Sequence, residues 1–161
     1  MINKKSLEYR QNIKAYLLEL SSLINQYINE SDISGLAEIE IIRHKASSLN
    51  GFPVSKFVIS FNEKVTEKFR NFIDGLYYAN DSEVYIWTKR TNICGLYKIE
   101  SIRNINLDFP FEINDEGILV FLSADFKDKL LFDFASDSNG NKMLEIEVQG
   151  QSWPDVSYNN Q

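Results

Sequence analysis

The sequence predicts an α+β fold, with a mainly antiparallel sheet and with a long N-terminal helix and a second helix packed on one face of it. An amphipathic segment begins the chain, and a second helical pattern lies near its middle. The C-terminal third is a run of short alternating segments separated by turn residues. Helices that are segregated from consecutive strands are typical of this class. The length fits a single domain, residues 1–161.

The first predicted element is a helix over residues 6–29. Apolar side chains recur there on one helical face, and no Gly or Pro interrupts the segment. After a polar break, residues 36–44 alternate at Ile39 and Ile41, as in a strand. Ala37 and the glutamates of this stretch are poor strand formers, so a helix remains open for it.

Strands and the second helix are predicted between residues 36 and 102. The Asn-Gly-Phe-Pro turn ending at Pro53 precedes the first well-defined strand pattern. Asn62 is the predicted N-cap of the second helix, which runs over residues 63–79. Aromatic and β-branched residues indicate the strands of this region. The predicted strands are 56–61, 83–89 and 95–102.

An antiparallel meander is predicted over residues 117–148. Residues 104–117 before it are expected to form a loop, because Pro110 opposes a central strand. The tail, residues 149–161, is expected to be poorly ordered except where Trp153 packs back. The three predicted strands of the meander are 118–123, 129–135 and 142–148.

Charge and composition favour a cytoplasmic protein with a protein partner. The net charge is −6, and residues 104–161 contain only 3 basic against 11 acidic residues. Such a region repels nucleic acid and attracts a basic protein. The single cysteine, Cys94, allows no internal disulfide. The first thirty residues lack the apolar core of a secretory signal, and no stretch reaches the roughly 18 apolar residues of a membrane span, so we expect no membrane association.

The last predicted hairpin, LLFDFASDSNGNKMLEIEV over residues 130–148, has an unusual outer face. If Asp133 pairs with Glu145, the turn closes around 137–141 and one face of the hairpin is apolar core. The opposite face then carries Asp133, Glu145 and Glu147, and carboxylates that face one another cost stability. This pattern fits a solvated face, a docking surface for a cationic partner, or a metal site.

Catalytic motifs are weak throughout the sequence. A restriction-endonuclease-like metal site needs Asp followed by Glu-x-Lys, and here a third carboxylate, Glu147, occupies the lysine position. His44 has no second histidine, Cys94 has no histidine nearby in sequence, and SDSNGN is a turn rather than a calcium loop. We therefore expect no enzyme activity, no cofactor and no metal.

The stretch from Gly117 to Val156, within a small acidic chain, resembles bacterial immunity proteins of polymorphic toxin systems, of the contact-dependent growth inhibition type. The resemblance implies a protein that binds and neutralises a cognate toxin domain, often a basic nuclease. A metal-dependent nuclease using Asp133, Glu145 and Glu147, and a generic protein-binding adaptor, are the alternatives. The oligomeric state stays open. The expected partner-binding residues are Asp125, Asp128, Asp133, Asp137, Glu145 and Glu147.

Overall fold

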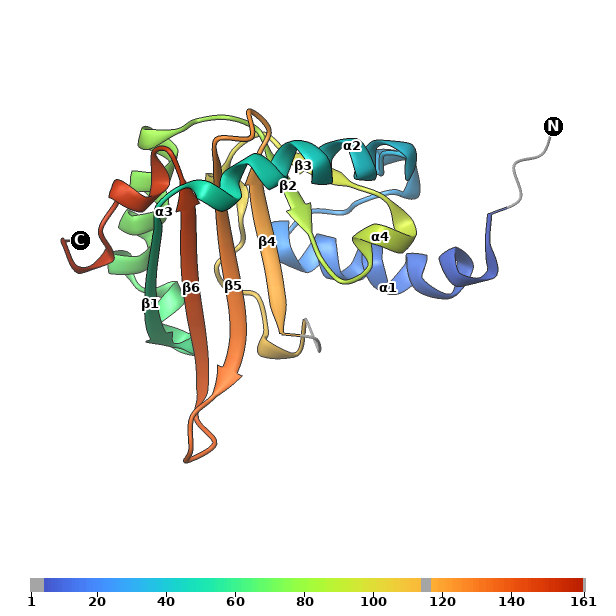
Figure 1. The fold of residues 1–161 in the computed structure, drawn as a ribbon. Helices are drawn as coiled ribbons and strands as arrows, with labels where there is room; N and C mark the ends of the chain where they lie inside the picture. Colours follow the sequence, from blue (N-terminus) through green and yellow to red (C-terminus); the bar gives the residue numbers. More distant parts are fainter. Residues whose placement is uncertain (1–4, 114–116, 161) are drawn as a thin grey trace.

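A six-stranded sheet is the centre of the computed structural model, which describes residues 5–113 and 117–160 (Figure 1). The strand order is β1-β6-β5-β4-β2-β3, and every neighbouring pair is antiparallel. The predicted α+β class with a mainly antiparallel sheet is therefore confirmed. The strands are β1 (Val54–Ser60), β2 (Val84–Trp87), β3 (Tyr97–Ile99), β4 (Ile118–Ser123), β5 (Asp128–Ser136) and β6 (Lys142–Gly150).

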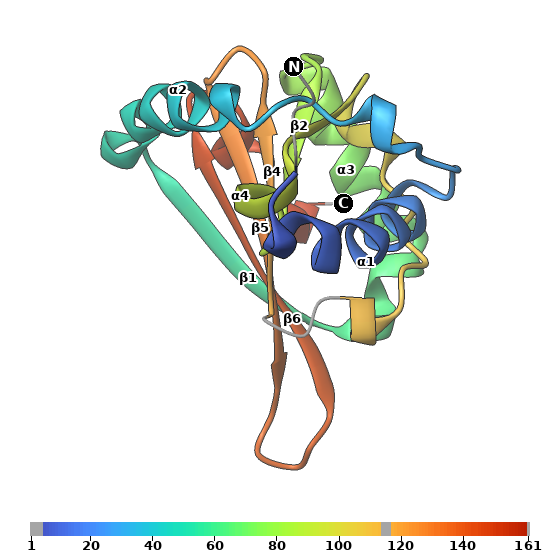
Figure 2. The same ribbon diagram turned by 90° about the vertical axis from the view of Figure 1, so that its right-hand side faces the viewer.

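The inner face of the sheet packs against two helices, α1 (Leu7–Ile24) and α3 (Glu67–Ala79). Both lie on the same side of the sheet, as Figure 2 shows. The predicted first helix is confirmed, but it ends at Ile24 rather than at residue 29, and the residue that caps it, Asn25, adopts a left-handed conformation. The main core fills the space between these helices and the inner side chains of the strands.

The start of α3 differs from the prediction. Residues Phe61–Val65 form a 3-10 turn, and Thr66 rather than Asn62 is the N-cap. The Thr66 hydroxyl accepts a hydrogen bond from the Phe69 amide, which satisfies one of the free donors of the first turn. Asn62 and Thr66 are both residue types that cap helices. In the structure Thr66 is the cap, and Phe61, in the 3-10 turn before it, packs in the core.

Residues Ala37–Ala46 form a helix, α2, so the strand interpretation of this stretch is wrong. Ile39 and Ile42, three positions apart, lie on one helical face and pack against Leu49, Leu96 and Leu122 in a second apolar cluster. This cluster lies on the outer face of the sheet, opposite α1 and α3 (Figure 2). The described elements therefore cover the second face of the sheet as well, at one of its ends.

The tail is more ordered than predicted, and the expected packing of Trp153 against the rest of the fold is confirmed. Two 3-10 turns, Trp153–Asp155 and Tyr158–Asn160, follow β6. Trp153 is fully buried and its indole N–H donates to the Leu76 carbonyl of α3. Residues 114–116 of the predicted loop and residue 161 of the tail lie outside the described residues.

Between β3 and β4 the described chain forms no strand, as predicted for residues 104–117, yet four of its described side chains are buried in the main core. These are Ile102, Ile105, Leu107 and Phe109. A short helix, α4 (Thr91–Cys94), joins β2 to β3. No helix in residues 5–113 or 117–160 combines the length and the apolar character that crossing a membrane requires.

Candidate functional site

The outer face of the sheet is the surface on which strand alternation gathers the predicted carboxylates. In β5 the side chains of Leu130, Phe132 and Phe134 enter the core, as predicted. Successive side chains of a strand point to opposite faces, so Leu131 and Asp133 lie on the outer face. Asp133 pairs directly with Glu145 of β6, which confirms the predicted register.

Among residues 5–113 and 117–160, the elements that cover the outer face lie at the end nearest the β4–β5 turn. Leu122, Tyr85 and Trp87 lie in the apolar cluster beneath α2 and the turn that follows it. Figure 1 shows α2 crossing this end of the sheet and leaving the strands below it bare. We call the uncovered part the open face; it consists of Lys56, Val58, Ile118, Val120, Leu131, Asp133, Glu145 and Glu147.

Two rows of side chains cross the open face from β1 to β4. The first row is Val58, Glu145, Asp133 and Ile118, and the second is Lys56, Glu147, Leu131 and Val120. In the second row Lys56 Nζ lies 3.5 Å from Glu147 Oε2, so that carboxylate has an ion-pair partner. In the first row the described structure gives neither Glu145 nor Asp133 an ion pair. Two like charges therefore face each other between two apolar side chains.

A shallow hollow of about 320 Å³ lies where the two rows meet, over β1, β6 and β5. Its walls combine carboxylates with the apolar side chains of Val58 and Leu131. Val58 is 56% exposed and Ile118, at the far end of the first row, is 46% exposed. The open face thus presents apolar area and unpaired negative charge together.

Asp128, one of the six predicted partner-binding residues, does not lie on this surface. It is fully buried, and its carboxylate accepts hydrogen bonds from the Ser152 amide at 2.8 Å and the Trp153 amide at 2.9 Å. The Asn80 side chain donates a third, at 2.8 Å. These bonds tie the tail and the end of α3 to the start of β5. A carboxylate used in this way offers no charge to a partner, and we remove Asp128 from the candidate site.

Asp125 and Asp137 are exposed, but each stabilises a turn at an opposite end of β5. Partial burial raises the pKa of Asp125, yet hydrogen bonds from the Ser123 hydroxyl and the Lys127 amide outweigh it and lower the pKa below its ordinary value. Bonds from the Asn141 side chain and amide lower the pKa of Asp137. The six predicted residues therefore do not form one patch; Asp133, Glu145 and Glu147 do.

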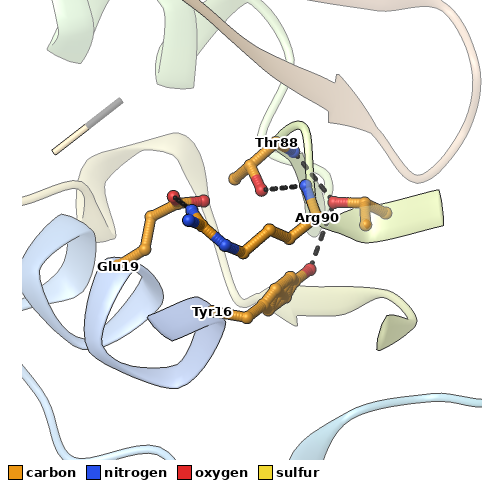
Figure 3. A network of polar contacts seen from close by, with 5 residues as sticks. Tyr16, Glu19, Thr88 and Arg90 are labelled. Atoms are coloured by element: carbon orange, nitrogen blue, oxygen red, sulfur yellow. Dashed lines mark hydrogen bonds and ion pairs between the residues drawn. The ribbon is translucent and has the colours of Figure 1, made fainter. Parts of the chain in front are cut away.

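A buried polar network, which was not among the predicted sites, joins α1 to the turn after β2 (Figure 3). Arg90 Nη1 lies 2.8 Å from Glu19 Oε2, and the Tyr16 hydroxyl donates to the Gly95 carbonyl at 2.8 Å. Burial raises the pKa of Glu19, while the Thr88 hydroxyl and Arg90 oppose that rise. Glu19 lies between apolar positions on the buried face of α1, which was the signal available in the sequence. The network therefore holds α1 against the segment between β2 and β3.

The described residues do not assemble the metal site of the nuclease alternative. Within residues 5–113 and 117–160, no three His, Cys, Asp or Glu side chains are grouped closely enough to hold a metal ion. Asp133, Glu145 and Glu147 are among these side chains. Burial raises the pKa of the Cys94 thiol to about 11, which keeps the reactive thiolate scarce at neutral pH.

Comparisons with family models, curated proteins and solved structures found no match to this chain. The sequence pattern and the strand register both support the open face as a candidate site.

Proposed function

We propose that the chain is a cytoplasmic immunity protein, which binds a cognate toxin domain with a basic surface and neutralises it without catalysis. The observation that supports this proposal is the open face. It combines exposed apolar side chains with a facing pair of carboxylates, Asp133 and Glu145, that have no ion pair in the described structure.

The composition of the open face suits a protein interface. Val58, Ile118 and Leu131 offer apolar area, and burying such area is favourable at roughly 25 cal/mol per Å². The carboxylates repel one another in the free protein, which costs stability. Cationic side chains of a partner would remove that repulsion on binding. The face therefore matches a partner surface that is both apolar and basic.

The acidic charge also favours inhibition of one class of toxin. A nuclease must attract the phosphate backbone of its substrate, so its substrate-binding surface is basic. An acidic face binds the same surface and competes with nucleic acid for it. Long-range attraction between opposite charges also speeds encounter, which suits a protein that must capture a toxin before it acts.

The adaptor alternative would use the same face, so identification of the partner decides between the two. The experiment is a pull-down from the native cells with the tagged chain, at low and high salt, with bound proteins identified by mass spectrometry. We expect one basic toxin domain in stoichiometric amount, bound more strongly at low salt. Recovery of an unrelated host protein would support the adaptor function instead. Absence of any stoichiometric partner would contradict both.

A further inference from the structure

Among the described residues, one long edge of the sheet has no strand paired to it. Its edge strands are β1 and β3. β3 contains three residues, and Ser34 forms a bridge to Leu96 immediately before it. β1 contains seven residues and pairs only with β6. A long, uncovered edge strand is a surface to which another strand can add.

The register identifies which backbone groups of β1 face this free edge. The Gly150 amide donates to the Pro53 carbonyl, so Pro53 and Gly150 form a hydrogen-bonded pair of the antiparallel ladder. Such pairs alternate along a ladder, which directs the N–H and C=O groups of Val54, Lys56 and Val58 away from β6. In the described chain these groups have no backbone hydrogen-bond partner outside the ladder.

The side chains of the same three residues point to the outer face, where Val58 and Lys56 belong to the open face. A strand added at this edge would extend both rows of the open face by one position. Natural proteins protect free edges with charged residues, prolines or bulges. Within β1 the only charged residue is Lys56, which already lies beside Glu147.

The inner side of this edge favours an extended segment over a second copy of the chain. Phe57 of β1 packs edge-on against Phe72 of α3 and stacks on Tyr158 of the tail, with ring centroids 4.6 Å apart in the stacked pair. Figure 1 shows α3 and the tail behind β1 and reaching past its free edge. This layer can support one added strand. A second copy related by a two-fold axis would bring its own α3 into the space that this layer occupies.

We propose that an extended segment of the toxin pairs with the free edge of β1 as a seventh strand, with a Lys or Arg side chain in register with Val58. That side chain would continue the row of Val58, Glu145 and Asp133 and lie toward the two unpaired carboxylates. The position in register with Lys56 would not be basic, because like charges directly opposite each other are destabilising. This inference rests on the proposed function, because it specifies how the partner binds.

A tethered strand tests the edge without the toxin. A segment of alternating Val and Thr with one Arg is joined to Gln161 by a flexible Gly/Ser linker, which gives an effective concentration in the millimolar range. Amide hydrogen exchange is followed by NMR. We expect the amides of Val54, Lys56 and Val58 to exchange about 10-fold or more slowly than in the untethered chain. Exchange at unchanged rates would overturn the proposal.

Matched variants separate edge pairing from other effects. Val58→Pro removes an outward N–H that no described ladder bond uses, and proline is tolerated on the solvent side of an edge strand. Val58→Ala removes the same side chain and keeps the N–H. Protection should be lost in Val58→Pro and kept in Val58→Ala, and a tethered segment with Glu in place of Arg should protect less. Equal protection in all versions would contradict the proposal. If the pull-down identifies a toxin but the edge stays unprotected, only the edge inference fails.

Discussion

Single carboxylates of the C-terminal region serve two different purposes. Asp128 and Asp137 accept hydrogen bonds from backbone amides and hold turns in place, whereas Glu145 is exposed and has no ion pair in the described structure. The sequence shows an acidic side chain at each of these positions. The structure separates them by burial and by hydrogen-bond partners, which depend on segments distant in the chain.

Asp128 is expected to be the carboxylate on which stability depends most. Asp128→Ala leaves two buried or partly buried amides and the Asn80 side chain without an acceptor, and we expect the free energy of unfolding to fall by about 3 kcal/mol. Urea unfolding followed by tryptophan fluorescence measures this. The exposed Asp155 supplies the control, because Asp155→Ala should change stability by less than about 0.5 kcal/mol. Equal stability of the two variants would contradict the structural role of Asp128.

Burial of Glu19 is expected to make the free energy of unfolding depend on pH. Burial raises the pKa of Glu19 above its ordinary value of 4.5, so the folded chain holds this proton to higher pH than the unfolded chain. The resulting stabilisation is complete below pH 4.5 and is lost as the pH rises through the folded pKa. Glu19→Gln should therefore gain stability relative to the wild type as the pH rises from 4.5. A difference that stays constant with pH, with Glu100→Gln as the reference variant, would refute this assignment.

At the scale of elements, the β5–β6 hairpin depends on one glycine of its turn. Gly140 has φ of +80°, a conformation that side chains disfavour, although no atom lies within 4 Å of an added Cβ. Gly140→Ala should cost about 1 kcal/mol of unfolding free energy. Gly51 also has open space around it but no positive φ, so Gly51→Ala should cost less. Comparable losses for the two variants would show that the turn conformation is not the cause.

Elements with a strong local pattern were predictable from the sequence. Alternation of apolar residues identified β4, β5 and β6, and it also gave the pairing of Asp133 with Glu145. The stretch around Ile39 was ambiguous, because its isoleucines satisfy both a strand period and a helical period. In the structure this stretch is a helix, and its isoleucines pack on Leu49 and on Leu122, which is distant in the chain. The order of the tail likewise depends on Trp153 and its bond to α3.

At the scale of the whole molecule, unequal covering of the sheet creates the candidate site. α1 and α3 cover one face, while α2 covers only one end of the other (Figure 2). The sequence indicated an acidic outer face on the hairpin. It could not show that α2 leaves this part bare, or that three of the six predicted acidic residues lie at the ends of β5. Both facts depend on how elements are arranged in space.

The affinity of the captured toxin domain tests binding through the open face most directly. It is measured for the wild type, for Glu145→Lys on the open face, and for Glu100→Lys. Glu100 is an exposed residue directly after β3, so this variant makes the same charge change away from the open face. Glu145→Lys should weaken binding about 10-fold or more and reduce its salt dependence, since it places a cation against a basic partner. Glu100→Lys should stay close to the wild type. Unchanged affinity and salt dependence in Glu145→Lys would contradict binding through the open face.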